Sequence, residues 1–422
     1  MSLQQRFHEM RHGFHPTFWI ANSLELFERL AYYGATAVLA VFLGNIGLGE
    51  EAGTLSGIFS GMIYTLPPIA GVLVDKYGFR KTLMACFLIF SVGYFLIGMA
   101  GMELGESVTL VVGKRTYVIT VLIFTAIGGS LIKPCIVGTV SKTSTPETKS
   151  LGFSIYYTIV NIGGAIGPLL AIPVRENIGI EYVLVTSSIT SLLLFLGTFF
   201  FFSEPKDSSG EEHVEQRTFG KVFADMLVVF ANVKFMTFLI FFSGLYIMFW
   251  QIFYLLPFYT KDILLFEKFE IIETVDAFCI IFLTIPLALL SKKLKPIVAI
   301  IVGFIAATIS WLVVGIGGTI ATTIAGIAVY AIGESIVAPR FYEYVGSLAP
   351  KGQIGTFMGF AFLPVAIGSF VAGPVADKLR ITYMDTHPAM MWYWVAGIGI
   401  LSTVLLILYN AIVKPSEENQ NP

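Results

Sequence analysis

The sequence predicts an all-α membrane protein with twelve transmembrane helices arranged as two halves of six. Of its 422 residues, 56% are hydrophobic and only 13% are charged, and the mean hydropathy is +0.80. Soluble domains carry about twice that share of charged residues. Apolar runs of about 20 residues, each long enough to cross a bilayer, alternate with short polar breaks. One longer polar stretch separates the first six runs from the next six.

The predicted spans follow one another in two sets. The first set covers residues 17–43, 54–74, 82–102, 117–141, 152–173 and 181–203. The second set covers residues 236–260, 271–291, 296–316, 319–342, 353–376 and 389–413. After the polar stretch, Phe219 to Lys234 has the pattern of an amphipathic helix that lies on the membrane surface. We expect an N-terminal half over 1–203, a cytoplasmic linker with this helix over 204–235, and a C-terminal half over 236–422.

Lysine and arginine are concentrated in the loops on the side of the N-terminus. The positive-inside rule therefore places both termini in the cytoplasm. The first 16 residues, which include Arg6 and Arg11, are too polar for a cleavable signal peptide. We expect a multi-pass monomer in the cell (inner) membrane, in contact with the lipid bilayer.

Several classes of function lack support in the sequence. A net charge of −2 gives no reason to expect a nucleic-acid partner. Cys86, Cys135 and Cys279 lie in apolar runs, so we expect neither disulfides nor a metal site. The sequence contains no His-Glu-x-x-His, Gly-x-Ser-x-Gly or nucleotide-binding loop. We therefore expect a protein that is not an enzyme and that uses no cofactor.

The first span carries Glu25, Glu28 and Arg29 inside an apolar run. Their i, i+3 and i+4 spacing places them on one face of a helix. Charges inside a bilayer are costly and are kept mainly where they face a bundle interior or a water-filled cavity. A structural ion pair with a neighbouring helix is the alternative, although one carboxylate would be enough to neutralise one arginine.

The short basic loop between the second and third spans carries a second motif. It reads Gly-x-x-x-Asp-Lys-x-Gly-x-Arg-Lys and consists of Gly71, Asp75, Lys76, Gly78, Arg80 and Lys81. It resembles the signature of the major facilitator superfamily at the same place in the topology. With the six-plus-six layout, this resemblance implies the major facilitator superfamily fold. We expect the motif to form a cytoplasmic gate, and a simple positive-inside anchor is the alternative.

Residues in the first half also resemble a more specific family. Residues 25–34 read Glu-x-x-Glu-Arg-Leu-x-Tyr-Tyr-Gly, which is similar to the hallmark of the proton-dependent oligopeptide transporter family with leucine in place of phenylalanine. Residues 129–134 read Gly-Ser-Leu-Ile-Lys-Pro and resemble the family's Gly-x-x-Leu-x-Lys-Pro, which supplies a binding-site lysine. Tyr64 stands where the family has a substrate-contacting tyrosine. The fifth span, around Asn161, is close to the family's second signature.

The C-terminal half matches this family less closely. Glu334 lies in a segment that resembles the tenth span of the family, whose glutamate receives a peptide's amino terminus, and Asp276 stands in the place of an asparagine. Trp250 lies in a seventh-span pattern that ends in glutamate in the family and in Tyr254 here. Thr36 replaces a family arginine that pairs with that glutamate at the outer gate. The resemblance therefore does not transfer the family's coupling scheme intact.

A zwitterionic peptide needs cations at one end of its binding site and a carboxylate at the other. Arg29 and Lys133 can hold the carboxylate, and Glu334 can hold the ammonium group. Pairing of Lys133 with Glu25 or Glu28, and of Glu334 with Arg340 or Lys133, is the structural alternative. The full set of predicted substrate contacts is Arg29, Tyr32, Tyr33, Tyr64, Lys133, Asn161, Trp250, Tyr254 and Glu334.

These observations predict a proton-coupled secondary active transporter. We expect Glu25 and Glu28 to couple transport to protons, because a substrate carboxylate and a glutamate would compete for Arg29 and protonation of the glutamate frees it. We expect a symporter that imports di- or tripeptides, or a related small solute with a carboxylate, by alternating access, so that its partners are this solute and protons. Two alternatives stay open. Gly163-x-x-x-Gly167-Pro168 partly resembles the antiporter signature of drug exporters, which favours a proton-linked exporter of drugs or other organic solutes. A transporter-like receptor that never cycles is the second alternative.

Overall fold

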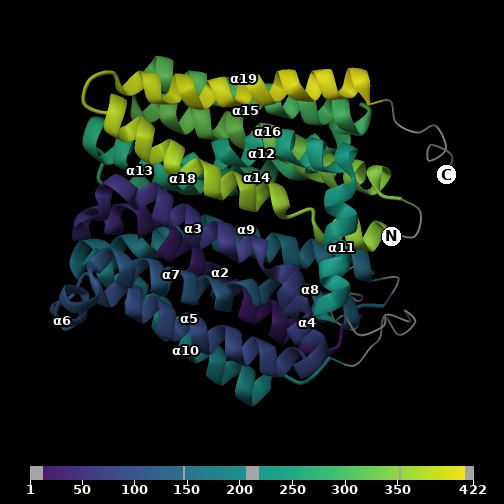
Figure 1. The fold of residues 1–422 in the computed structure, drawn as a ribbon, viewed down its shortest axis with the longest axis horizontal. Coiled ribbons are helices and arrows are strands. Elements are labelled where there is room, and N and C mark those ends of the chain that lie inside the picture. Colours follow the sequence, from purple (N-terminus) through teal and green to yellow (C-terminus); the bar gives the residue numbers. More distant parts are fainter. Residues whose placement is uncertain (1–12, 146–147, 206–217, 351–352, 414–422) are drawn as a thin grey trace. The chain divides into compact units, whose positions relative to one another are not determined.

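The computed structural model describes residues 13–145, 148–205, 218–350 and 353–413, and most of them are helical (Figure 1). The first 12 residues and residues 206–217 of the predicted linker lie outside this described part. Within it, eleven helical stretches are long and apolar enough to cross a membrane. The stretch Pro16–Thr65 contains two spans, because a π-turn at Gly44–Leu48 interrupts it. Twelve spans result, and the predicted fold class is confirmed.

The interruption falls at a glycine for a physical reason. Gly47 has a φ of 88°, in the left-handed region that glycine enters without a steric penalty. Helix α2 therefore ends at Leu43, and α3 starts at Ala52 after a π-turn and a short 3-10 turn.

Clustering of contacts divides the chain into two compact units. Unit 1 contains residues 1–38 and 66–222, and unit 2 contains residues 39–65 and 223–422. The units differ from the predicted halves mainly in residues 39–65, which pack with helices from the second half of the sequence. The domain boundaries at 203 and 236 stay a prediction.

Unit 1 is held together by α5, which packs against α7 and α10; α5 and α10 lie side by side in Figure 1. The short helix α6 lies in a stretch that was expected to be a loop. The helices of this unit are α2 (Pro16–Leu43, whose last turn belongs to unit 2), α4 (Pro67–Tyr77), α5 (Phe79–Met99), α6 (Glu103–Val112), α7 (Lys114–Ser130), α8 (Ile132–Lys142), α9 (Lys149–Asn177) and α10 (Ile180–Phe201).

Unit 2 has a core in which α15 packs against α16 and α19. Trp311 and Trp392 stack there, with ring centroids 5.1 Å apart. The amphipathic stretch forms α11 (Phe219–Ala231), whose first four residues are assigned to unit 1 and the rest to unit 2. The other helices are α3 (Ala52–Thr65), α12 (Val233–Tyr254), α13 (Leu256–Phe258), α14 (Phe269–Ser291), α15 (Pro296–Gly317), α16 (Ile320–Leu348), α17 (Ile354–Gly359), α18 (Leu363–Tyr383) and α19 (Pro388–Ile412).

Breaks near proline interrupt several of the spans that were expected to be continuous, and two of them bear on the site. The span 54–74 is interrupted before Pro67, and the span 117–141 is interrupted at Leu131, shortly before Pro134. Proline has no N–H to donate, and its ring clashes with the preceding turn. The second break places Lys133 in the first turn of α8, which positions it for the site described below.

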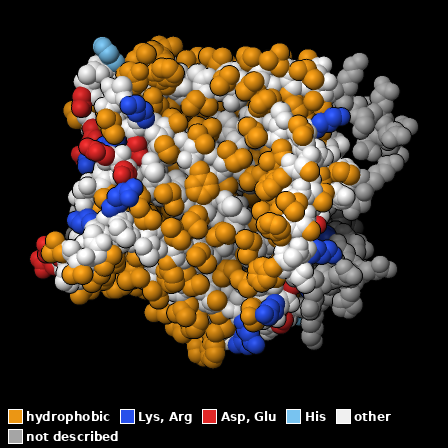
Figure 2. Space-filling model, in the orientation of Figure 1, with side chains coloured by type: hydrophobic (Ala, Val, Ile, Leu, Met, Phe, Trp, Pro, Cys, Tyr) orange, Lys and Arg blue, Asp and Glu red, His pale blue; other side chains and the backbone are white. Residues whose placement is uncertain are grey.

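Hydrophobic side chains cover the surface over the middle of the helices, while lysine, arginine, aspartate and glutamate gather near helix ends (Figure 2). Many large apolar side chains are exposed, for example Leu193, Phe200 and Phe282. Such a surface is expected where lipid rather than water surrounds the helices. The chain is therefore an integral, multi-pass membrane protein.

In unit 2, α3 and α18 approach each other through small residues. A Cβ atom built on Gly373 would lie 2.4 Å from the Gly53 carbonyl oxygen, and one built on Gly57 would lie 2.6 Å from the Ser369 carbonyl oxygen. Small residues permit such close backbone contacts between membrane helices. Asp377 of α18 also accepts hydrogen bonds from the backbone N–H groups of Gly53 (2.8 Å) and Thr54 (2.7 Å), and so caps the start of α3. Backbone contact and cap together fix this helix pair.

Replacing Gly373 with valine is expected to destabilise unit 2 by about 1–3 kcal/mol, because the added side chain meets backbone that cannot move aside. Thermal unfolding of the purified protein measures the effect. Gly397→Val is the matched control, since, apart from its own helix, no heavy atom of the described residues lies within 4 Å of a Cβ built on that glycine. An equal loss of thermal stability in both variants would show that the contact between α3 and α18 is not responsible.

Candidate functional site

The charged residues of α2 are almost completely withdrawn from solvent. Glu25 is 0% exposed, Glu28 is 1% and Arg29 is 2%. The Arg29 guanidinium bonds to a carboxylate oxygen of Glu28, and its Nε lies 3.5 Å from Glu25 Oε1. The predicted common helix face is therefore present, and both carboxylates contact the arginine.

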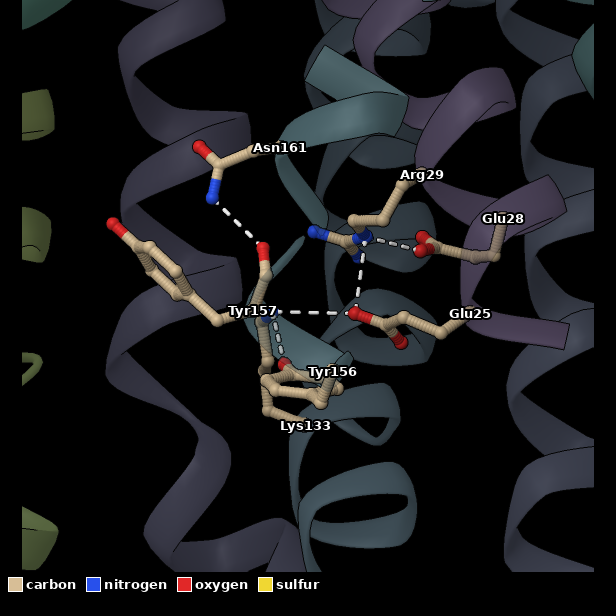
Figure 3. Close-up of polar contacts among 7 residues, drawn as sticks. All are labelled: Glu25, Glu28, Arg29, Lys133, Tyr156, Tyr157 and Asn161. Carbon is tan, nitrogen blue, oxygen red and sulfur yellow. Dashed lines mark hydrogen bonds and ion pairs between the residues drawn. The ribbon is translucent and has the colours of Figure 1, made fainter. Parts of the chain in front are cut away.

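Lys133 joins this group from α8. Its Nζ lies 3.4 Å from Glu25 Oε1 and donates a 2.7 Å hydrogen bond to the Tyr156 hydroxyl of α9 (Figure 3). Glu25 Oε1 thus contacts both cations. We call Glu25, Glu28, Arg29 and Lys133 the charge cluster. The pairing of Lys133 with Glu25 was the structural alternative for this lysine, and it is the arrangement present here.

The charge cluster has no net charge, but two of its carboxylate oxygens lack a hydrogen bond among the described residues. It contains two cations and two carboxylates, yet Glu25 Oε2 and Glu28 Oε1 are buried and have no hydrogen-bond partner in the described part of the chain. Buried carboxylate oxygens without partners are costly. Either of these carboxylate oxygens can therefore take up a proton without losing an existing hydrogen bond.

Glycines of α9 allow this helix to lie directly on α2 at the charge cluster. A Cβ atom built on Gly163 would be 2.3 Å from Arg29 Cβ, and one on Gly167 would be 2.7 Å from the Leu30 carbonyl oxygen. These glycines belong to the segment that partly resembles the antiporter signature of drug exporters. Their contacts here are those of close helix packing.

Two tyrosines of α2 and one asparagine of α9 are the other residues of unit 1 that were predicted to contact substrate. The Arg29 guanidinium carbon lies 4.7 Å from the ring centroid of Tyr32 and 6.0 Å from that of Tyr33, within the range of cation–π attraction. The Asn161 amide donates to the Tyr157 carbonyl oxygen one turn earlier in α9 (2.8 Å). Figure 3 shows Asn161 and the charge cluster in one view.

The aromatic residues predicted to contact substrate lie together in unit 2. The rings of Trp250 and Tyr254 stack with centroids 5.3 Å apart, and the Tyr64 ring centroid is 6.2 Å from that of Trp250. Trp250 Nε1 donates to the Val365 carbonyl oxygen (3.2 Å). The Tyr254 hydroxyl bonds to Ser369 Oγ (2.7 Å). Tyr254 therefore links α12 to α18, and its role as a substrate contact stays a prediction.

Glu334 does not take either structural partner that was considered for it. Arg340 bonds instead to Glu343 and to Ser291 Oγ (3.3 Å), and Lys133 pairs with Glu25. Glu334 Oε2 is buried and has no hydrogen-bond partner among the described residues. This carboxylate therefore keeps the capacity to receive a ligand.

The predicted gate motif is anchored by a residue that sequence reasoning missed. Gly78 has a φ of 84°, and the backbone N–H groups that follow it, those of Phe79 and Arg80, donate to the Glu204 carboxylate (2.6 and 3.1 Å). Glu204 thus caps the start of α5, where a negative charge is favourable. The Arg80 guanidinium bonds to the carbonyl oxygen of Phe199. The position of this acidic residue, just after the sixth span, was the only sign in the sequence that it could have such a role.

The other motif residues differ in exposure. Asp75, Lys76 and Lys81 are exposed, while Gly71 and Gly78 are half-buried. The gating role of this loop stays a prediction.

Comparison with known proteins gives three kinds of similarity. A family model described as Major Facilitator Superfamily matches residues 24–373. The dipeptide and tripeptide permease A of Erwinia pyrifoliae is 22% identical over 481 residues, which cover 96% of each chain. The permease A of Citrobacter koseri is 27% identical over 232 residues, which are 54% of this chain and 44% of that permease. For several curated relatives, the matched region therefore spans less than half of their length.

Solved structures share the fold. A POT family transporter in complex with a thioalcohol conjugated peptide has a TM-score of 0.74 at 15% identity, covering 94% of this chain and 96% of that one. The peptide transporter POT in complex with sulfate has a TM-score of 0.73 at 16% identity, covering 94% of each chain.

Proposed function

Because this chain belongs to the Major Facilitator Superfamily, we propose that it is a proton-coupled symporter that imports di- or tripeptides, or a related small solute with a carboxylate, by alternating access. The chain is a transporter and not an enzyme, as the family match implies. The resemblance to proton-dependent oligopeptide transporters agrees with the permeases and transporters to which it is similar. We further propose a monomer in the cell (inner) membrane with both termini in the cytoplasm, on the basis of the distribution of lysine and arginine.

The observation that carries the proposal is the buried charge cluster, with its two cations and two carboxylates. A substrate carboxylate that arrived alone would leave excess negative charge, and a proton that arrived alone would leave excess positive charge. An uncompensated buried charge costs several kcal/mol. Joint binding of one proton and one carboxylate keeps the cluster neutral, and joint binding is what a symporter requires.

Within the cluster, Glu28 is the better candidate to accept the proton. Glu25 contacts both Arg29 and Lys133, whereas the ion pair of Glu28 is with Arg29 alone among the described residues. A protonated Glu28 releases Arg29, whose planar guanidinium can then bind the substrate carboxylate with two hydrogen bonds. Glu25 continues to neutralise Lys133, so that both predicted coupling residues have a role.

The proposed substrate class also uses unit 2. Glu334 would receive the ammonium group of a peptide, since one buried oxygen of its carboxylate has no hydrogen-bond partner among the residues that the structure describes. Tyr32, Tyr33 and Asn161 of unit 1, and Tyr64, Trp250 and Tyr254 of unit 2, would provide further contacts. Names of relatives, such as dipeptide and tripeptide permease, support peptides over other carboxylates.

In proteoliposomes, an inward proton gradient is expected to drive accumulation of a dipeptide. The same dipeptide with its carboxylate masked as an amide should not accumulate, because Arg29 and Lys133 then have no anion to bind. Uptake of radiolabelled ligand measures both results. Proton-driven extrusion would support the exporter instead, and binding without any flux would support the receptor.

A further inference from the structure

Three lysines stand within four residues in the turn between α14 and α15 of unit 2. They are Lys292, Lys293 and Lys295, and all three side chains are exposed. The sequence has no aspartate or glutamate between Asp276 and Glu334, and in the described part of the chain none of the three lysines forms an ion pair. We call these three residues the lysine turn. Its positive charge is therefore not compensated by the protein.

Hydrogen bonds hold the lysine turn in a defined place beside α16. Arg340 Nε of α16 donates to Ser291 Oγ at the end of α14 (3.3 Å), and the N–H of Leu294 donates to the Ser291 carbonyl oxygen (3.0 Å). The charge of Arg340 is compensated by Glu343, to which its guanidinium bonds. This acid is thereby engaged and does not neutralise the lysines.

The lysine turn continues an apolar stripe of α14. Phe282, Ile285 and Leu289 are 72%, 72% and 60% exposed, and steps of three and four residues place them on one face of the helix. The next steps along the same face lead to Lys292 and Lys293. An exposed apolar stripe that ends in positive charge matches a molecule that has an acyl chain and an anionic head group.

Helix stability explains only part of the lysine turn. Lys292 and Lys293 follow the C-terminus of α14, where a cation is favourable. Lys295, however, is the N-cap of α15, and its side chain makes no capping hydrogen bond. A cation is unfavourable at that end of a helix, because the N-terminus has a partial positive charge. The positive-inside rule is the alternative explanation, and it requires no bound molecule.

We propose that the lysine turn binds the phosphate of an anionic phospholipid, whose acyl chain lies along Phe282, Ile285 and Leu289. Near a membrane surface, each lysine adds about fivefold to the binding of an anionic lipid. A free phosphate ion has no acyl chain to cover the stripe, so the stripe favours the lipid. The orientation proposed above places this lipid in the cytoplasmic leaflet. The site does not depend on the proposed transport function.

Native mass spectrometry of the purified full-length protein, mixed with equal amounts of phosphatidylglycerol and phosphatidylcholine, tests the site. The wild type is expected to retain anionic phosphatidylglycerol in preference to zwitterionic phosphatidylcholine. In Lys292→Gln/Lys293→Gln, the ratio of bound phosphatidylglycerol to phosphatidylcholine should fall at least about tenfold. Lys234→Gln/Lys378→Gln is the matched control, because it removes the same charge from two exposed lysines of unit 2 that stand apart from each other. This control should keep the preference of the wild type.

Three results would overturn the proposal. A wild type without preference would leave the positive-inside rule as the explanation of the lysines. An equal fall in both double variants would show general attraction between charges and no site at the turn. Displacement of phosphatidylglycerol by excess inorganic phosphate would show an anion site that takes no account of the acyl chain. Uptake into proteoliposomes is measured separately, so failure of the proposed function would leave the lipid result unchanged.

Discussion

Arg29→Gln is expected to abolish transport and to destabilise unit 1. Removal of this guanidinium leaves Glu28 without an ion-pair partner among the described residues and Glu25 with Lys133 alone, and both carboxylates are buried. Removal of one partner from a buried ion pair typically costs about 3–5 kcal/mol. The thermal unfolding midpoint measures the loss of stability, and uptake into proteoliposomes measures the loss of transport.

The double variant Glu28→Gln/Arg29→Gln separates the two effects. It removes one cation together with the carboxylate that contacts it, so that Glu25 and Lys133 remain as a balanced pair. We expect most of the stability to return, while transport stays absent because the substrate carboxylate has lost its guanidinium. If the double variant is as unstable as Arg29→Gln, charge balance does not explain the stability of the cluster.

Glu28→Gln is expected to separate substrate movement from the proton gradient. Glutamine resembles a protonated glutamate, so Arg29 is permanently released and the substrate carboxylate can bind without a proton. Counterflow exchange of labelled for unlabelled substrate should therefore persist. Gradient-driven accumulation should vanish, whereas a one-proton symporter under a difference of one pH unit can accumulate substrate about tenfold.

Glu343→Gln is the matched control for this uncoupling. Glu343 also bonds to an arginine, Arg340, but its side chain is about half exposed, so its loss should not alter coupling. Persistent acceleration of uptake by the gradient in Glu28→Gln would place the coupling proton elsewhere, with Glu25 as the next residue to replace.

Periodicity predicts which residues share a helix face, but not which neighbour completes a site. The spacing of Glu25, Glu28 and Arg29 placed them together correctly, and the helical contacts confirm it. The sequence could not show which carboxylate pairs with which cation. That pairing depends on where α8 begins, which is set by Pro134, and on the hydrogen bond from Lys133 to Tyr156.

Contacts between segments that are far apart in the sequence were not predicted either, because the pattern of one segment does not show its distant neighbours. The apolar runs predicted twelve spans, because length and composition alone decide whether a helix can cross a bilayer. Glu204 was assigned to a polar linker, although it caps α5 more than a hundred residues earlier. Residues 39–65 have the composition of any other span, and nothing in their own pattern shows that they pack with α18.

The pairing of α3 with α18 has a consequence for the synthesis of the protein. Asp377 caps a backbone group that lies 324 residues earlier in the chain. At about 5–20 residues per second, a ribosome needs roughly 15 s to one minute to make the residues in between. During that time α3 is in the membrane without its cap and with its glycine face uncovered. A chain that stops before α18 never covers that face, and we expect cellular quality control to recognise such a truncated product by it.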